Sequence, residues 1–248
     1  MKSIGLMNLN QPPKHWLNTP FGLQGKTVTL TFNCSQAACD FFSRIHKGKK
    51  ITTVQPAPPT QASGEGLLTN SDQWLVHAAT VQRKHVLLAI HLKTRYCMLF
   101  FDMKKADAEG FVQVFTNRWT IGVMDLLMKC GALDFVDPQI PQQLLNEQCQ
   151  SFVMYPRGDR SAQTHINEVL RFFKWDAEDF DFVNQPWSAL YCDARTNHTP
   201  RTIKGQKDYI FPDEEMMIHW LVAVGGVPVP KAEQVREIHR RSLRAQVD

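Results

Sequence analysis

The sequence lacks the short motifs that mark the common kinds of catalytic site. It has no HExxH zinc motif, no glycine-rich phosphate-binding loop and no two cysteines in CxxC spacing. Gly64 and Gly66 lie close together, but no strand pattern precedes them, as a dinucleotide-binding turn would require. We therefore expect no cofactor and no metal ion, and a binding protein rather than an enzyme.

Long hydrophobic runs are also missing. The first residues form no continuous apolar segment of signal-peptide length, because Pro12 and Pro13 interrupt them. No later run approaches the roughly 20 apolar residues that a membrane-spanning helix needs. The 6 cysteines are widely spaced, and most lie in apolar stretches as buried thiols do. We expect a cytoplasmic protein that does not enter the membrane.

The charge of the chain is only mildly positive. Lys and Arg number 28 against 24 Asp and Glu, a net charge of +4 over 248 residues. A nucleic-acid-binding protein is often far more basic, so composition by itself does not indicate one. Any such function must therefore rest on local groups of cations.

Two regions have the hydrophobic pattern of strands. Residues 26–32 alternate threonine with Val28, Leu30 and Phe32, which predicts a half-buried strand. Residues 73–101 contain three apolar runs separated by short polar breaks, which predicts an antiparallel meander. In the second break, the charges of Lys93 and Arg95 are expected to lie in solvent at a tight turn.

Helical spacing recurs through the rest of the chain. We expect helices over 36–48 with Ser35 as cap, over 104–131 as one long helix or two in sequence, after Pro141, over 158–175 with Asp159 or Ser161 as cap, over 212–224 and in the tail. Residues 151–155 fit a short strand, and residues 191–209 fit a polar loop. In the helix after Asp159, Ile166 and Phe173 point inward and His165 points outward.

These elements predict an α+β fold, with a mainly antiparallel sheet packed against two longer helices and a basic C-terminal helix. We divide the chain into an N-terminal extension (1–25), a single domain (26–226) with a Pro-rich loop at 52–66, and a basic helical tail (227–248).

Three stretches, taken in order, resemble a small bacterial domain family of unknown function. They are QRKHVLLAIHLKTRYCMLFFDMKKADAEGFV (82–112), DRSAQTHINEVLRFF (159–173) and KDYIFPDEEMMIHWL (207–221). The order and spacing agree over about residues 26–222. The resemblance implies a single α+β domain found in bacterial genomes and mobile elements, and it assigns no activity and no catalytic residue. The Pro-rich loop, the basic loop near Asn197 and the tail depart from the pattern.

Two groups of residues could carry chemistry. His77, His85 and His91 fall on neighbouring predicted strands, but alternation does not force them onto one face and no ligand-rich loop accompanies them, so we expect no metal site there. Cys192, Asp193 and His198 lie within one polar segment and could activate a nucleophile. A nucleic-acid-processing hydrolase that uses this segment, or Asp213, Glu214 and Glu215, is the alternative function.

Three groups of cations are candidates for binding nucleic acid or an acidic partner. They are Arg44, Lys47, Lys49 and Lys50; Arg195, Arg201, Lys204 and Lys207; and Arg236, Arg240, Arg241 and Arg244 of the tail. Several cations on one face are needed, because each neutralised phosphate releases counterions.

We expect a protein of mobile-element or phage-related origin that contacts nucleic acid or a host nucleoprotein complex through these cations. An inhibitor of a nucleic-acid-guided defence system fits this prediction. A homodimer formed through the apolar helix MMIHWLVAV is a third interpretation.

Overall fold

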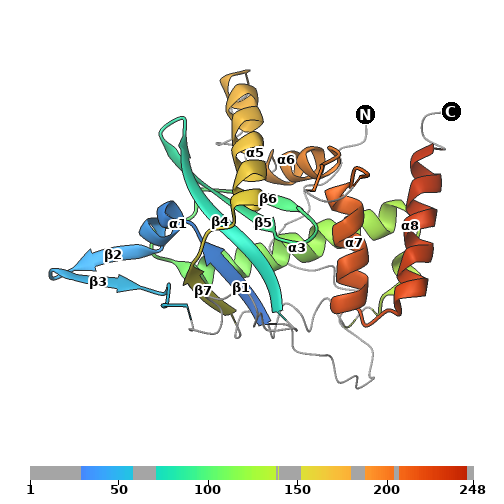
Figure 1. Cartoon of the computed structure of the whole chain (residues 1–248), viewed down its shortest axis with the longest axis horizontal. Coiled ribbons are helices and arrows are strands. Elements are labelled where there is room, and N and C mark those ends of the chain that lie inside the picture. Colours follow the sequence, from blue (N-terminus) through green and yellow to red (C-terminus); the bar gives the residue numbers. More distant parts are fainter. Residues whose placement is uncertain are drawn as a thin grey trace, which may run out of the picture.

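The computed structural model of the chain describes residues 29–57, 71–137, 139, 152–179, 188–203 and 207–244. The N-terminal extension, the helix expected after Pro141, Lys204 and most of the Pro-rich loop lie outside these ranges. The described part is an α+β fold with one main sheet, a projecting two-stranded ribbon and helices on both faces (Figure 1).

The main sheet has 5 strands in the order β6-β5-β4-β1-β7. Its strands are β1 (Thr29–Cys34), β4 (Ser71–Val81), β5 (Lys84–His91), β6 (Cys97–Phe101) and β7 (Phe152–Pro156). β4, β5 and β6 form the predicted antiparallel meander, whereas β1 runs parallel to both of its neighbours. With the antiparallel ribbon of β2 and β3, the pairing is mainly antiparallel, which confirms the predicted fold class.

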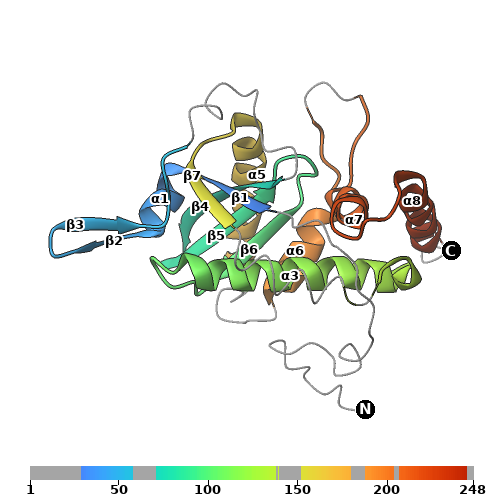
Figure 2. The same cartoon turned by 90° about the horizontal axis from the view of Figure 1, so that it is seen from below.

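Helices cover both faces of the sheet. Their bounds are α1 (Gln36–Phe41), α3 (Ala108–Lys129), the short 3-10 turn η2 (Leu133–Phe135), α5 (Arg160–Asp179), α6 (Ser188–Asn197), α7 (Pro212–Ala223) and α8 (Val229–Arg244). The long helix α3 runs across one face and α5 packs on the other (Figure 2). The predicted helix after Lys104 is therefore continuous.

The larger core lies between α3 and the sheet and is rich in aromatic side chains. Phe32 of β1 meets Phe115 of α3 with ring centroids 5.0 Å apart, and Trp74 of β4 meets the same ring at 4.7 Å. On the opposite face, Ile166 and Phe173 of α5 are buried against β4, β5 and β6, as predicted, whereas His165, predicted to point outward, is only 9% exposed. Burial of this apolar area is the main source of the stability of the fold.

The strand β1 differs from its prediction because it lies inside the sheet. It pairs with β4 on one side and β7 on the other. Thr31 is only 3% exposed and Asn33 only 2%. The strand that was predicted to be half-buried is therefore buried on both faces, although polar and apolar residues alternate along it.

The helix expected over residues 36–48 ends early. Ser35 caps α1 as predicted, because its Oγ accepts a hydrogen bond from the Ala38 amide. The helix stops at Phe41, and β2 (Ser43–His46) and β3 (Lys49–Thr52) follow as a hairpin. Lys47 and Gly48 both have positive φ, 51° and 76°, which suits a two-residue turn.

The polar segment expected as a loop over 191–209 is helical up to Asn197. The Asn197 side chain donates to the Cys97 carbonyl and accepts from the Cys97 amide, both at 2.7 Å. One turn earlier, the Asp193 carboxylate accepts from the Leu99 amide at 2.8 Å. Side chains of α6 thus satisfy the backbone of β6, whose outer edge would otherwise be open to further strands.

The turn between β5 and β6 is also less exposed than expected. Lys93 lies in solvent, but Thr94 is 2% exposed and Arg95 8%. The Arg95 guanidinium donates to Ser161 Oγ of α5 at 3.0 Å. The prediction of a fully solvated turn is therefore wrong for Arg95, which ties the turn to α5.

The C-terminal helix α8 packs against α7 and enters the larger core. Ala232 and Val235 of α8 are fully buried in the same cluster as Met216 and Trp220 of α7. The apolar side of the MMIHWLVAV helix is thus occupied within the chain. No described helix has the length and hydropathy to cross a membrane.

Candidate functional site

A basic β-hairpin extends from one end of the molecule. β2 and β3 form a sheet of their own, and two perpendicular views show the ribbon projecting beyond α1 (Figure 1 and Figure 2). We call residues 43–52 the basic hairpin. Arg44, Lys47, Lys49 and Lys50 are all exposed, and residues 41–57 contain no Asp or Glu. The hairpin is therefore a concentrated positive arm.

The positive charge of the basic hairpin is not neutralised by neighbouring carboxylates. In the described part of the chain, none of its four cations forms an ion pair. The strand register places Arg44 opposite Ile51 and Ile45 opposite Lys50. Because directly opposite residues share a face, Arg44 lies on one face of the ribbon and Lys50 on the other. Ile45 is 71% exposed, so the hairpin offers apolar as well as charged contacts.

The second predicted group of cations is divided between structural and exposed positions. Arg201 is 8% exposed and donates to Glu168 of α5 at 3.0 Å. Arg195 lies exposed on α6, and Lys207 lies exposed after the undescribed Lys204. The group therefore does not act as a single basic loop.

The tail arginines are likewise divided. Arg240 donates to both carboxylate oxygens of the buried Glu214, at 2.8 and 2.9 Å, and Arg236 reaches Glu214 at 2.9 Å and Glu215 at 2.5 Å. Burial disfavours the charged Glu214 carboxylate, but hydrogen bonds from Arg240 and the charge of Arg236 lower its pKa below the ordinary value. Arg241 and Arg244 are exposed.

The basic groups do not share one face. The basic hairpin and α8 lie at opposite ends of the molecule in both views (Figure 1 and Figure 2). Arg236 and Arg240 of the tail are hydrogen-bonded to α7 and hold α7 and α8 together. The basic hairpin is therefore the group of cations best placed to meet a partner.

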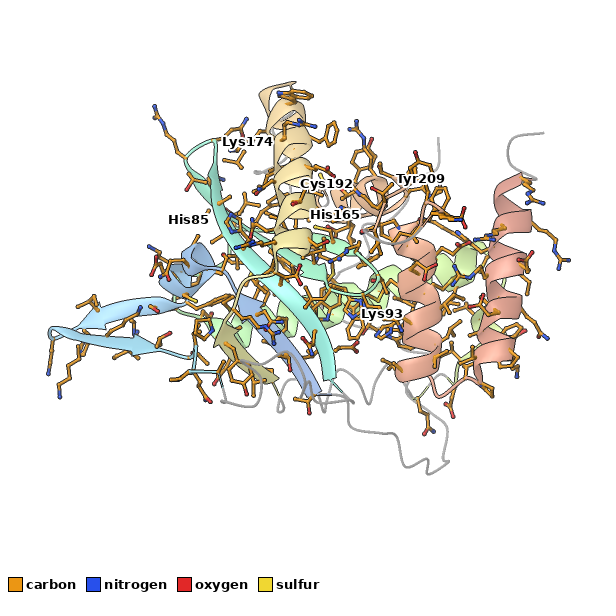
Figure 3. The ribbon with its side chains drawn as sticks, viewed as in Figure 1. His85, Lys93, His165, Lys174, Cys192 and Tyr209 are labelled. Atoms are coloured by element: carbon orange, nitrogen blue, oxygen red, sulfur yellow. The ribbon has the colours of Figure 1, made fainter. Side chains whose placement is uncertain are left out.

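The residues predicted for a hydrolase do not form one catalytic unit. Asp193 is bonded to Arg118 of α3 and to the β6 backbone, and its burial raises the pKa of its carboxyl to about 6 despite the charge of Arg118. Cys192 is 9% exposed and lies in the core beside α5 (Figure 3). His198 instead bonds to Asp213 Oδ2 at 3.0 Å. The predicted pairing of Asp193 with His198 is absent from these contacts.

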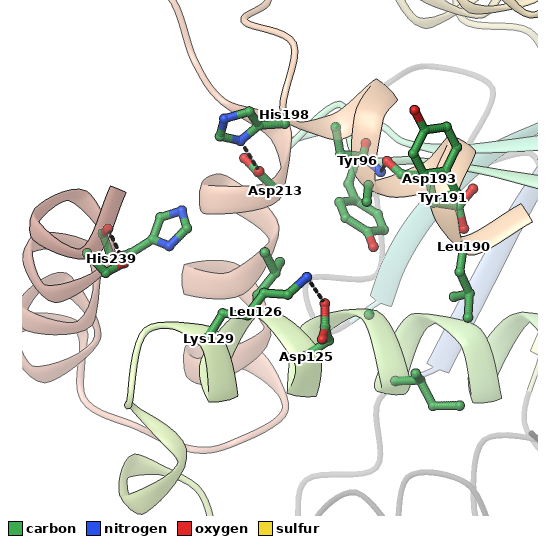
Figure 4. A pocket seen from close by; sticks show the side chains of 15 residues that line it. Tyr96, Asp125, Leu126, Lys129, Leu190, Tyr191, Asp193, His198, Asp213 and His239 are labelled. Carbon is green, nitrogen blue, oxygen red and sulfur yellow. Dashed lines mark hydrogen bonds and ion pairs between the residues drawn. The ribbon is translucent and has the colours of Figure 1, made fainter. Parts of the chain in front are cut away.

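A pocket of about 590 Å³ lies between α3, α6, α7 and α8 (Figure 4). The pair of His198 and Asp213 lines it, together with His239 of α8, whose buried Nδ1 has no hydrogen-bond partner in the described residues. A histidine bonded to a carboxylate can accept or donate a proton. The alternative function therefore has a pocket. Asp193 also lines it, but His198 is hydrogen-bonded to Asp213 and not to Asp193.

A separate cluster of polar side chains lies where the start of β4 meets α7. Asp72 of β4 is 3% exposed, and its Oδ1 accepts a hydrogen bond from His219 Nε2 and lies 3.4 Å from His91 Nε2. Burial disfavours the Asp72 carboxylate, but hydrogen bonds from His219 and His91 outweigh this and lower its pKa.

Of the predicted histidines, only His91 belongs to this cluster. His77 shares a hydrogen bond with Ser35 at 2.9 Å, and His85 packs beside the Phe41 ring at the far end of β5. Asp72 and His219 were not predicted as site residues from the sequence. In the sequence, Asp72 stands before the apolar run of β4, and His219 interrupts an apolar helix. Neither local pattern indicates that these two residues are in contact.

A family model, described as a domain of unknown function (DUF6933), matches residues 32–215, most of the chain. The chain belongs to this family. The DUF6933 match includes the basic hairpin, Asp72 and His91, and it ends in the first turn of α7 before His219 and α8. Comparison with curated proteins and with solved structures gives no match.

Proposed function

We propose that this DUF6933 protein binds duplex nucleic acid through the basic hairpin. One observation carries the proposal: four exposed cations on a projecting ribbon have no carboxylate partner in the described residues. Unpaired cations gain most from contact with phosphates, because each contact releases condensed counterions. Cations that already hold carboxylates, such as Arg236, would first have to give up those bonds.

The shape of the basic hairpin suits a groove between two phosphate backbones. The major groove of B-DNA is about 12 Å wide and admits a two-stranded β-ribbon. Cations on both faces of the ribbon and at Lys47 in its turn could meet phosphates on both sides of such a groove. The exposed Ile45 could then contact base edges such as the thymine methyl group.

Neutralising the hairpin tests this proposal. We expect K49Q/K50Q to weaken binding to a labelled 20-base-pair duplex by roughly tenfold or more, because two phosphate contacts are lost. The measurement is fluorescence anisotropy at fixed salt. The matched control is K104Q/K105Q, which removes two exposed lysines from the turn before α3. Equal affinity of the two variants would contradict the proposal, as would absence of binding by the unaltered protein.

The hydrolase alternative is tested with the same duplex. A nuclease that uses the pocket pair should cleave the duplex in the presence of Mg²⁺ and lose turnover in H198Q, while binding is retained. A protein that only binds should leave the duplex intact with or without the divalent ion.

The finer predictions stay predictions. These are a mobile-element origin, binding to a host nucleoprotein complex, inhibition of a nucleic-acid-guided defence system, a homodimer and a cytoplasmic location. A pull-down with and without nuclease treatment separates a partner reached through nucleic acid from one bound directly.

A further inference from the structure

The cluster of Asp72, His91 and His219 has the geometry of an incomplete coordination sphere. The three residues come from β4, β5 and α7, and each offers one ligand atom, all within 4.8 Å of one another. Ligands at about 2.0–2.2 Å from a tetrahedral zinc ion are roughly 3.3–3.6 Å apart. Asp72 Oδ1 and His91 Nε2 already lie 3.4 Å apart, whereas His219 Nε2 is hydrogen-bonded to the same oxygen and would have to move away from it to make room for an ion.

A second observation concerns the other oxygen of the same carboxylate. Asp72 Oδ2 is buried, and no described residue donates a hydrogen bond to it. A buried carboxylate oxygen without a partner is costly, since its interactions with water are lost and nothing replaces them. A cation that both oxygens of the Asp72 carboxylate coordinate would satisfy it.

The donor set favours a transition metal. Two imidazole nitrogens and one carboxylate suit zinc or iron(II), whereas calcium and magnesium prefer oxygen ligands alone. Three protein ligands leave at least one coordination position for water. His219 is 18% exposed while its two partners are 3% exposed, so the cluster reaches solvent on the α7 side.

The surroundings of His91 support a ligand role. Its Nδ1 lies 2.9 Å from the hydroxyl of the buried Thr94, and the Trp74 ring packs on the imidazole at 5.0 Å. Without an ion, Nδ1 accepts from the Thr94 amide at 3.2 Å and the proton faces Asp72. With an ion on Nε2, the ring proton moves to Nδ1 and is donated to the Thr94 hydroxyl, and the hydrogen bond from the Thr94 amide is given up. Such outer partners orient metal-binding histidines.

We propose that Asp72, His91 and His219 bind one divalent transition-metal ion of the zinc class. The site is separate from the basic hairpin, and the proposal does not depend on nucleic-acid binding.

Calorimetry on the full-length protein, first stripped with a chelator, tests this site with Zn²⁺ as the probe. We expect binding of one ion, weakened at least about 100-fold in D72N and H219Q, since each removes a ligand. H198Q is the matched control, because it removes a histidine that also bonds to an aspartate, and its affinity should stay within about twofold of the unaltered protein.

Cobalt(II) gives a readout that needs no variant. Nitrogen and oxygen ligands should produce visible absorption bands of Co²⁺ without a thiolate charge-transfer band in the near ultraviolet. A thiolate band would assign the ion to the buried cysteines and overturn the proposal. So would the absence of Zn²⁺ binding by the unaltered protein, or equal affinity of H219Q and H198Q.

Discussion

Individual polar side chains complete the hydrogen bonding of this sheet. Asp193 and Asn197, one turn apart on α6, bond to the backbone of β6 where a further strand would otherwise pair. Arg118 of α3 bonds to both the Leu99 carbonyl and Asp193. These side chains explain why a polar segment is buried here, and why Asp193 is better understood as structural than as catalytic.

At the same scale, His165 should make stability depend on pH. Burial lowers its pKa, the nearby Arg95 and Arg201 lower it further, and Glu168 opposes them. The folded protein therefore holds His165 neutral, while the unfolded chain binds a proton below pH about 6.5. Stability is present above that pH and falls as the solution is acidified, by up to about 1.4 kcal/mol per pH unit for one such group.

Urea unfolding at several values between pH 7.5 and 5 checks this prediction. H165Q does not titrate at this position, so its stability should fall less steeply than that of the unaltered protein. If the unfolding free energies of H165Q and of the unaltered protein changed equally with pH, His165 would not be the cause of the pH dependence.

At the scale of elements, ion pairs join α7 and α8. Glu214 of α7 is 4% exposed and receives both Arg236 and Arg240 of α8. A buried carboxylate is tolerated only when cations or donors compensate it. Arg236 and Arg240 thus belong to the contact between two helices, and of the four predicted tail arginines only Arg241 and Arg244 are left for a partner outside the chain.

We expect R236A to lower the free energy of unfolding by about 2–3 kcal/mol, because Arg240 alone then compensates Glu214. R241A is the control on the same helix, and it should change stability by less than about 0.5 kcal/mol, since Arg241 is exposed. Urea unfolding monitored by fluorescence measures both. A similar loss in the two variants would mean that the ion pairs with α7 do not stabilise the helix contact.

For the whole molecule, the distribution of charge matters more than its sum. The net charge of +4 is small, yet the basic hairpin holds four exposed cations that form no ion pair with a described residue. If these cations meet four phosphates, the logarithm of the binding constant should fall with the logarithm of the salt concentration with a slope near −3.6.

Titrations of the duplex between about 50 and 200 mM salt test this. K49Q/K50Q should make the slope shallower by about 1.8, and K104Q/K105Q should leave it unchanged. A slope near zero in the unaltered protein would mean that phosphate contacts do not drive binding.

The sequence by itself determined the helices and strands whose hydrophobic pattern can be recognised without knowledge of the residues that they contact. Alternation and short polar breaks predicted the meander of β4, β5 and β6, and helical spacing predicted α3, α5 and α7. These signals are local because each strand or helix must present its own apolar face to a core.

Only the tertiary structure decided which polar residues meet. Asp72 and His219 are 147 residues apart, and no periodicity could bring them together. Two other contacts also join residues that lie far apart in the sequence. Glu214 binds Arg236 and Arg240, and the edge of β6 binds the polar side chains of α6. A polar side chain has no preferred distant partner until the backbone is folded, so charge in the sequence shows where cations occur and the fold determines which of them stay unpaired.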